Sequence, residues 1–304
     1  MLTRLRIFSI ISIVIIVIKR RKNVKDIRVV TLQDISCFGK CSITVALPVI
    51  SAMGISCSVI PTAVLSTHTG GFKGFTFRDL TDDIPAVAEH WGREGLSFNG
   101  IYTGYLGSEK QIGVIEDFID QFGEDAFIFV DPAMADDGKL YTGFDMSFVS
   151  AMARLCGKAD IVVPNMTEAS MMLGLEYKER GTYDEVYVLD ILKKLCALGA
   201  KRAVLTGVSY DGKNQGCVSY DSETGEVKSY FRPHLPRQSH GTGDVFASSF
   251  FGALMLGHDI YRAMQIAVDF TVDSIAATVG DESHWFGVKF EKCIPALVES
   301  CRCE

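Results

Sequence analysis

The residues Gly241-Thr242-Gly243-Asp244 stand where a loop becomes a helix, because the run from Val245 to Leu254 that follows them is small and apolar. Glycines at the start of a helix let free backbone N–H groups approach an anion, and the helix dipole favours negative charge there. In that setting Asp244 can take a proton from an attacking hydroxyl. Together these parts are typical of phosphoryl transfer. A G-x-G-D turn also occurs as an ordinary helix cap, so the rest of the chain must decide.

Length and composition describe a soluble globular protein. The chain has 304 residues, of which 48% are hydrophobic and 22% charged, and this suits one large α/β domain. A formal net charge of −7, without a basic stripe, argues against nucleic-acid binding. The nine cysteines are scattered and form no C-x-x-C pair, which predicts reduced cytoplasmic thiols rather than disulfides or a zinc site.

Residues 1–26 are interpreted as an N-terminal extension. The apolar run of residues 7–18 is followed by Lys19-Arg20-Arg21-Lys22. This run is shorter than the roughly 20 residues that a membrane-spanning helix needs, and no small-residue cleavage site follows it. A membrane anchor, a dispensable extension and a start codon assigned too early are the three explanations. We favour those without membrane contact, and the basic cluster would in any case hold the following domain in the cytoplasm.

From residue 27 onwards, apolar runs alternate with amphipathic stretches, which predicts βαβ units, a mostly parallel sheet and helices on both of its faces. The predicted strands are Ile27–Gln33, Cys57–Leu65, Gly100–Thr103, Ala126–Val130, Asp160–Val163 and Arg202–Thr206. The predicted helices are Ile43–Met53, Leu80–Trp91, Gln111–Phe122, Met146–Cys156 and Asp184–Leu198. A polar turn between residues 216–220 and 226–232 predicts a late antiparallel hairpin. From Thr242 onwards we expect helices, with breaks near residues 257–259 and 280–287. Residues 27–304 therefore form one domain.

Ligands of open parallel sheets bind beyond the carboxyl ends of the strands, so the residues that follow each strand are the candidates for a site. Asp131 follows the fourth predicted strand, and Asn165 and Glu168 follow the fifth, three apart across a helix start. These oxygen ligands suit Mg²⁺. Each has an alternative role, because Asp-Pro is a common turn starter and Asn165 with Glu168 can cap a helix. Thr206 and Gly207 follow the sixth strand, where they can meet nucleotide phosphates or simply form a turn.

The first three strands are followed by residues suited to an organic substrate. Asp34 closes the first strand, and Tyr105 follows the third, where its ring can lie against another ring or pack on the sheet edge. The stretch from Ser66 to Phe72 follows the second strand, and its polar side chains and glycines are typical of a lid or substrate loop. We expect His68 in this loop to contact a ligand rather than to transfer protons.

Taken together, these segments resemble the ribokinase-like superfamily, and most closely its pyridoxal/pyridoxamine (vitamin B6) kinase branch. The stretches that carry the likeness are Leu32-Gln33-Asp34, Ser66-Thr67-His68-Thr69-Gly70, Thr103-Gly104-Tyr105-Leu106-Gly107-Ser108, Asp131-Pro132-Ala133-Met134, Pro164-Asn165 through Glu168, and Gly241-Thr242-Gly243-Asp244. In order and spacing they cover the chain from about residue 26 to the last helices. The resemblance implies a three-layer α/β/α fold of the ribokinase-like class.

The resemblance also implies ATP-dependent transfer of the γ-phosphoryl group to the 5′-hydroxymethyl group of pyridoxal, pyridoxamine or pyridoxine. By this likeness Asp244 deprotonates the hydroxyl, and the amides of Gly241, Thr242 and Gly243 form an anion hole. Magnesium and its waters would be organised by Asp131, Asn165 and Glu168. A monovalent cation is a further cofactor that the likeness admits, and the implied assembly is a cytoplasmic homodimer.

The likeness assigns contacts for both substrates. The nucleotide would meet Thr206, Gly207, Asn165 and Thr242. The pyridine ring would be bordered by Asp34, Thr62, His68 and Tyr105.

The chain departs from the family pattern at Asp34, where many B6 kinases have a serine. A carboxylate there can pair with a protonated ring nitrogen or with the amine of pyridoxamine, so we hypothesise a preference for pyridoxamine. Cys41, close to this site in sequence, is interpreted as a small apolar filler.

Two rival functions stay open. The first is a hydroxymethylpyrimidine or sugar kinase with the same base, although residues 35–40 lack the glycine-rich run of hydroxymethylpyrimidine kinases. The second is a non-catalytic B6-binding protein, which would have no use for Asp131, Glu168 and Asp244 together.

Overall fold

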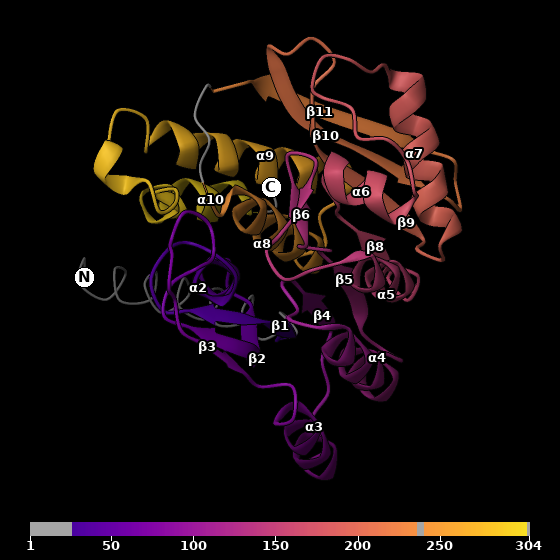
Figure 1. Ribbon diagram of the computed structural model, residues 1–304, viewed down its shortest axis with the longest axis vertical. Helices are drawn as coiled ribbons and strands as arrows, with labels where there is room; N and C mark the ends of the chain where they lie inside the picture. Colours follow the sequence, from indigo (N-terminus) through magenta and orange to yellow (C-terminus); the bar gives the residue numbers. More distant parts are fainter. Residues whose placement is uncertain (1–25, 236–239, 303–304) are drawn as a thin grey trace, which may run out of the picture.

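The computed structural model describes residues 26–235 and 240–302 (Figure 1). The predicted extension, residues 1–26, therefore lies outside the described residues except for Asp26. Within the described ranges, no helix is both long and apolar enough to cross a membrane.

A nine-stranded sheet runs through the middle of the molecule in the order β11-β10-β9-β8-β5-β4-β1-β2-β3. The neighbours from β9 to β2 in this order pair in parallel, as predicted. These strands are β1 (Arg28–Ser36), β2 (Ser56–Leu65), β4 (Gly100–Thr103), β5 (Phe127–Val130), β8 (Ile161–Val162) and β9 (Arg202–Val208).

The strands at both edges of this sheet pair antiparallel with their neighbours. The predicted late hairpin is confirmed, because β10 (Asn214–Asp221) pairs antiparallel with both β9 and β11 (Val227–Pro233). At the other edge, β3 (Phe77–Asp79) pairs antiparallel with β2. The sequence did not predict β3, because three exposed residues carry no alternation of apolar and polar side chains.

Helices cover both faces of the sheet, which confirms the three-layer prediction. One layer contains α3 (Ile84–Arg93), α4 (Glu109–Phe122), α5 (Met146–Cys156), α6 (Met166–Met172) and α7 (Glu185–Ala197). The other contains α2 (Ile43–Ala52), α8 (Thr242–Met255), α9 (Ile260–Ala276), α10 (Ile294–Ser300) and the 3₁₀ turn η2 (Phe290–Lys292). A further 3₁₀ turn, η1 (Glu282–His284), and a two-stranded sheet of β6 (Ala135–Asp136) and β7 (Lys139–Leu140) complete the described elements.

Two hydrophobic cores result, one on each side of the sheet. Successive residues of a strand point to opposite faces, and in β1 Val30 and Leu32 join the core beneath α3–α7 while Val29 joins the core beneath α2, α8 and α9. Burial of these strands on both faces explains why they read as continuous apolar runs in the sequence.

The helices begin in two different ways. Side-chain caps start α4, α5, α7 and α9, where Ser108, Asp145, Asp184 and Asp259 accept hydrogen bonds from amides of the first turn. No side chain caps α8, which starts at Gly241 in the left-handed conformation with φ of 77°. A Cβ atom built on Gly241 would lie 1.6 Å from the carbonyl oxygen of Lys40, so only glycine fits there.

Candidate active site

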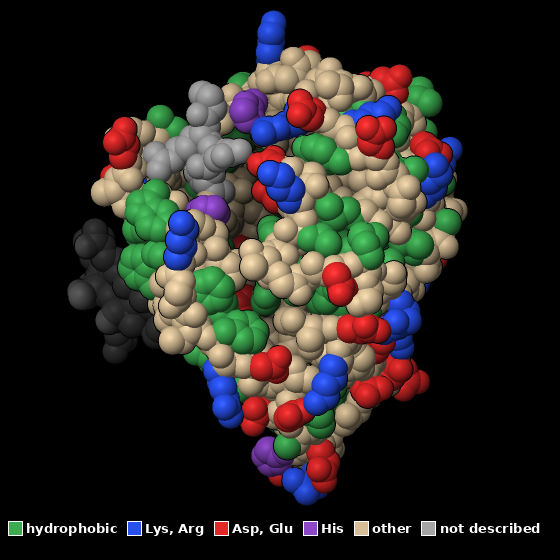
Figure 2. All heavy atoms as spheres, in the orientation of Figure 1, with side chains coloured by type: hydrophobic (Ala, Val, Ile, Leu, Met, Phe, Trp, Pro, Cys, Tyr) green, Lys and Arg blue, Asp and Glu red, His purple; other side chains and the backbone are tan. Residues whose placement is uncertain are grey.

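The carboxyl ends of the parallel strands bring the predicted site residues to one edge of the sheet. Leu32 of β1 pairs with Thr103 of β4, and Thr103 pairs with Val130 of β5. Further along the same edge, Asn165 and Thr206 form an isolated parallel bridge. Residues that follow these strands therefore start from neighbouring positions. Figure 2 shows that this face of the molecule is hollowed near its centre.

Three acidic side chains from distant parts of the sequence gather here. Burial raises the pKa of Asp131 well above its usual range, and the nearby charges of Glu168 and Asp244 raise it further. Asp131 follows β5, Glu168 lies in α6 and Asp244 lies in the first turn of α8. The structure thus brings together the three carboxylates that the sequence predicted to converge.

Asp244 has the properties of a proton acceptor. Burial raises its pKa to about 7, and Asp34 adds to the increase, while a hydrogen bond from the amide of Ser42 opposes it. A carboxylate with a pKa near neutrality is ionised often enough to act as a base and basic enough to hold the proton. The position at the start of α8 places this group beside the glycine turn 241–243.

Asn165 and Glu168 form a capping box, so the structural alternative considered for them is realised. The Asn165 side chain accepts from the Glu168 amide at 2.9 Å, and Glu168 accepts from the Asn165 amide at 2.8 Å. The other Glu168 oxygen accepts from the Met134 amide at 3.1 Å. Burial nevertheless raises the pKa of Glu168 to about 8, since amide donors only partly offset desolvation. Capping a helix and contributing a buried carboxyl group to the site are compatible roles.

A preformed cage of three or more His, Cys, Asp or Glu side chains around a metal does not occur among the described residues. Mg²⁺ rarely uses such a cage in phosphoryl-transfer sites, where one or two carboxylates, waters and substrate phosphates hold it. The donor set of Asp131, Glu168 and Asn165 is of that kind, and the charge of Glu168 raises the pKa of Asp131, as in a site built for a cation.

Asp34 is buried, with 3% of its surface exposed, at the end of β1. Desolvation raises its pKa, and hydrogen bonds from the hydroxyls of Ser42 and Ser36 oppose the increase; the Ser36 bond is 2.8 Å long. Tyr105 lies near enough for Asp34 to contribute, after burial, to raising the tyrosine pKa to about 12. The Tyr105 ring packs against Phe144, with centroids 5.5 Å apart, so its aromatic face belongs to a small cluster on this edge.

Thr62 occupies a different place from the one expected of a ligand contact. It is fully buried, and its hydroxyl donates to the carbonyl of Tyr105 at 3.2 Å. Gln111, also fully buried, donates to the Thr62 carbonyl at 2.9 Å and accepts from the Gly107 amide at 2.7 Å. This geometry does not support direct contact of Thr62 with a substrate, and instead makes Thr62 a support for the Tyr105 loop. The role of Gln111 was missed, because a single glutamine in an amphipathic helix gives no signal.

His68 is held by both ring nitrogens. Its Nδ1 accepts from the Gly70 amide at 3.1 Å, and Nε2 lies 2.9 Å from the carbonyl oxygen of Phe286, so the proton is assigned to Nε2. Burial lowers the pKa of the ring, which keeps it neutral. A ring engaged in this way is suited to packing rather than to proton transfer. Its neighbours Phe72 and His240, with ring centroids 5.0 and 5.1 Å away, were not singled out from the sequence.

Thr206 and Gly207 lie beside Asn165 at the same sheet edge. The Thr206 amide donates to the Pro164 carbonyl at 2.9 Å, and its hydroxyl points to the same oxygen at 3.3 Å. Gly207 has a φ of 69°, in the region that favours glycine, and its carbonyl accepts from Gln215 at 3.4 Å. Both residues are only partly buried, which leaves this corner accessible to a nucleotide.

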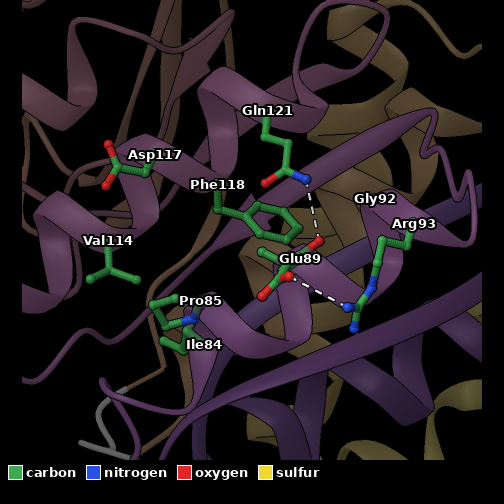
Figure 3. A pocket seen from close by; sticks show the side chains of 10 residues that line it. Ile84, Pro85, Glu89, Gly92, Arg93, Val114, Asp117, Phe118 and Gln121 are labelled. Atoms are coloured by element: carbon green, nitrogen blue, oxygen red, sulfur yellow. Dashed lines mark hydrogen bonds and ion pairs between the residues drawn. The ribbon is translucent and has the colours of Figure 1, made fainter.

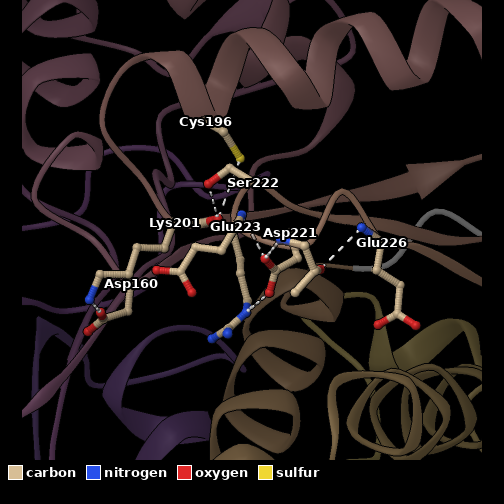
Figure 4. A network of polar contacts seen from close by, with 9 residues as sticks. Asp160, Cys196, Lys201, Asp221, Ser222, Glu223 and Glu226 are labelled. Atoms are coloured by element: carbon tan, nitrogen blue, oxygen red, sulfur yellow. Dashed lines mark hydrogen bonds and ion pairs between the residues drawn. The ribbon is translucent and has the colours of Figure 1, made fainter.

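Two other features of the surface do not form part of this site. A groove of about 550 Å³ between α3 and α4 is lined largely by helix side chains such as Pro85, Val114 and Phe118, and contains none of the predicted site residues (Figure 3). A polar network around Asp160, Lys201 and Asp221 links the starts of β8 and β9 and the end of β10 (Figure 4). Asp160 pairs with Lys201 and Asp221 pairs with Arg202, so we assign the network a structural role.

Comparison with known proteins agrees with this geometry. The sequence pattern of the phosphomethylpyrimidine kinase family matches residues 39–286. The chain belongs to this family. One similar solved structure is that of a Bacteroides thetaiotaomicron protein, described as a phosphomethylpyrimidine kinase and crystallised with pyridoxal. It is 36% identical, has a TM-score of 0.85, and the match covers 90% of this chain and 96% of that one.

Two further similar proteins are named as vitamin B6 kinases. The structure of pyridoxal kinase from Lactobacillus plantarum is 33% identical with a TM-score of 0.79, over 90% of this chain and 96% of that one. A pyridoxine/pyridoxal/pyridoxamine kinase of Bordetella avium is 26% identical over 263 residues, which is 82% of this chain and 85% of the relative. These findings confirm the predicted likeness to B6 kinases and the predicted fold.

Proposed function

We propose that this protein is an ATP-dependent kinase that phosphorylates the 5′-hydroxymethyl group of vitamin B6 vitamers. The observation that carries the proposal is the buried carboxylate of Asp244, whose pKa is raised to about 7, beside a glycine turn and two further buried carboxylates. The family pattern and the relatives named as B6 kinases support the choice of substrate.

The chemistry follows from the positions of the residues. Asp244 accepts the proton of the 5′-hydroxyl as its oxygen attacks the γ-phosphorus of ATP, and ADP leaves. Amides of Gly241, Thr242 and Gly243 stabilise the charge that develops on the transferring group, because they are already oriented before the reaction. Thr206 and Gly207, with Asn165 and Thr242, would hold the nucleotide.

Mg²⁺ would supply positive charge between the phosphates and the acidic cluster. Asp131, Asn165 and Glu168 fit it by their oxygen donors, and a bound cation would lower the raised pKa values of Asp131 and Glu168 and so favour their ionised forms. The family likeness also predicts a monovalent cation as a second cofactor.

On the substrate side, Asp34, Tyr105 and His68 would border the pyridine ring, with Thr62 holding the Tyr105 loop from behind. The buried carboxylate of Asp34 is placed to favour a vitamer that carries positive charge, so pyridoxamine is the proposed preferred substrate. A cytoplasmic homodimer is the assembly that the family likeness suggests.

A hydroxymethylpyrimidine kinase is the second candidate, and the description of the family favours it. A coupled ADP-release assay on the full chain, with the three B6 vitamers, hydroxymethylpyrimidine and ribose, distinguishes the candidates. We expect kcat/KM for at least one vitamer to exceed that for the other compounds by about tenfold or more, the scale of one net hydrogen bond. Turnover confined to hydroxymethylpyrimidine would replace our proposal with the second candidate, and no ADP release with any compound would favour a binding protein.

A further inference from the structure

Lys40 lies between two glycines from distant parts of the sequence. Its carbonyl oxygen is the atom that a Cβ built on Gly241 would meet, at 1.6 Å. On its other side, a Cβ built on Gly287 would lie 2.3 Å from the Cβ of Lys40 and 2.6 Å from its Cγ. These separations leave no room for a side chain, so the backbone of each glycine rests directly on Lys40.

The side chain of Lys40 is fixed at its far end as well. Its Nζ pairs with the carboxylate of Glu291 in η2 and lies 5.5 Å from the ring centroid of Phe290. The Lys40 side chain is 25% exposed and that of Glu291 is 47% exposed. An ion pair this open to water adds little to the stability of the fold, because solvent screens it. Its main effect is therefore to select one path for the Lys40 side chain.

Gly39, the preceding residue, makes a close contact of its own. A Cβ built on Gly39 would lie 2.0 Å from Cδ2 of His68. The His68 amide donates to the carbonyl of Phe38 at 3.2 Å, and His68 Nε2 lies 2.9 Å from the carbonyl oxygen of Phe286. The loop that follows β1 therefore joins the loop of His68 to the segment that follows α9.

The glycine turn at the start of α8 depends on backbone contacts. Among the described residues no side chain caps α8, and the Val245 amide closes its first turn by donating to the Gly241 carbonyl at 3.0 Å. The backbone of Gly241 itself rests on the carbonyl of Lys40. The amides of this turn are the proposed donors to the transferring phosphoryl group, and such donors are effective only when they are oriented beforehand.

We propose that Lys40 is a positioning residue: its ion pair with Glu291 keeps its carbonyl oxygen against Gly241 and so fixes the glycine turn that stabilises the transferring phosphoryl group. This inference rests on the proposed function. Loss of the pair frees the Lys40 side chain to leave Gly287, and its backbone then moves away from Gly241. The amides of the turn lose part of their alignment with the transition state, whereas the vitamer still binds.

The test compares Lys40→Met and Glu291→Met with the wild type in steady-state kinetics with pyridoxamine. Methionine keeps a long, unbranched side chain and removes the charge. We expect kcat to fall by about tenfold in both variants, a part of the ~100-fold cost of losing an anion-hole donor, with little change in KM. The double variant should lose no more than either single variant, because one pair can be broken only once.

Lys158→Met is the matched control. Lys158 pairs with Asp120, and their side chains are 33% and 63% exposed, close to the values for Lys40 and Glu291. Lys158 precedes β8, at the amino ends of the parallel strands and away from the site, so this variant should keep the wild-type kcat. Equal falls of kcat in Lys158→Met and Lys40→Met, or additive losses in the double variant, would overturn the proposal. Glu291→Met carries the test if Lys40→Met does not fold.

A second readout does not depend on turnover. Hydrogen exchange of the Val245 amide, measured by NMR in the full chain, reports opening of the glycine turn. We expect this exchange to be about threefold faster or more in Lys40→Met and Glu291→Met than in the wild type and in Lys158→Met. Unchanged exchange would reject the proposal, and faster exchange with wild-type kcat would reduce Lys40 to a structural contact and also overturn it.

The two proposals fail in different ways. Absence of vitamer turnover in the wild-type protein would contradict the proposed function. The exchange of the Val245 amide would still decide whether the pair of Lys40 and Glu291 holds the glycine turn in place.

Discussion

The carboxylate of Asp244 lies near enough to Asp131 for its charge to raise the Asp131 pKa. The two residues come from different elements, because Asp131 follows β5 and Asp244 lies in the first turn of α8. Both sit at the edge of the sheet where the parallel strands end. Parallel packing of β4, β5 and β8 fixes Asp131, and the glycine turn fixes Asp244. The two carboxylates therefore rest on rigid elements.

Replacement of Asp244 by alanine tests its role as the base. We expect kcat to fall by at least ~100-fold with little change in KM, because general-base catalysis contributes mainly in the transition state. Steady-state kinetics with pyridoxamine measures both constants. The exposed Asp117 on α4 provides the control, since Asp117→Ala removes an acid far from the site and should leave kcat unchanged. Wild-type turnover in Asp244→Ala would remove Asp244 from the mechanism.

The pH dependence of the rate should report the raised pKa of Asp244. The base must be ionised, so kcat should fall as the pH is lowered through about 7. Initial rates between pH 5 and 9 in a buffer series of constant ionic strength measure this limb. A limb near pH 4, the ordinary range of a carboxylate, would show that burial does not tune this residue.

Stability should change with pH in the opposite direction. Asp244 and Glu168 have folded-state pKa values of about 7 and about 8, above those of an unfolded chain, so the folded state binds more protons between about pH 4 and 8. The free energy of unfolding should therefore be greatest on the acid side of that window and fall as the pH rises through 7 to 8. Thermal unfolding without Mg²⁺ at pH 6 and pH 8 measures the trend. Asp244→Asn should flatten it, and a wild-type Tm that rises towards pH 8 would contradict the assignment.

Asp34→Ser tests the proposed selectivity for a charged vitamer. We expect kcat/KM for pyridoxamine to fall by about tenfold relative to pyridoxine, the scale of one hydrogen bond to a charged group. Competition between the two vitamers in one assay gives the ratio directly. If all three vitamers keep their relative kcat/KM values, the preference does not come from Asp34.

Gly241→Ala should damage both the fold and the site. The new Cβ would meet the Lys40 carbonyl at 1.6 Å in a conformation with φ of 77°, so we expect a loss of at least ~2 kcal/mol in the free energy of unfolding. Gly225→Ala is the matched control, because Gly225 has a similar φ of 74° and open space around it. Denaturant unfolding of both variants isolates the clash from the backbone strain. Equal losses of unfolding free energy in the two variants would mean that the Lys40 carbonyl moves away from the new Cβ without cost.

The sequence predicted the parallel sheet well because its strands are buried on both faces and read as apolar runs. The residues that follow those strands could be named for the same reason, since strand ends share one edge. The contacts of Thr62 and Gln111 could not be predicted, because a buried hydrogen bond between segments depends on packing that no local pattern records. The same holds for the backbone of Ser42, because nothing in the stretch Cys41-Ser42-Ile43 indicates that the φ of Ser42 is positive, at 54°.

The short β3 and the charged, proline-ended β11 bear on how the protein behaves when crowded. An open β-edge invites strands of other molecules to add to it, and short length, charge and proline all discourage such addition. At one edge of the sheet only Phe77–Asp79 are available to pair with another strand. At the other edge Lys228, Arg232 and Pro233 interrupt the strand. Concentrated solutions of this kinase should consequently resist fibril growth by sheet extension, and any stable self-association has to be built from side-chain surfaces instead.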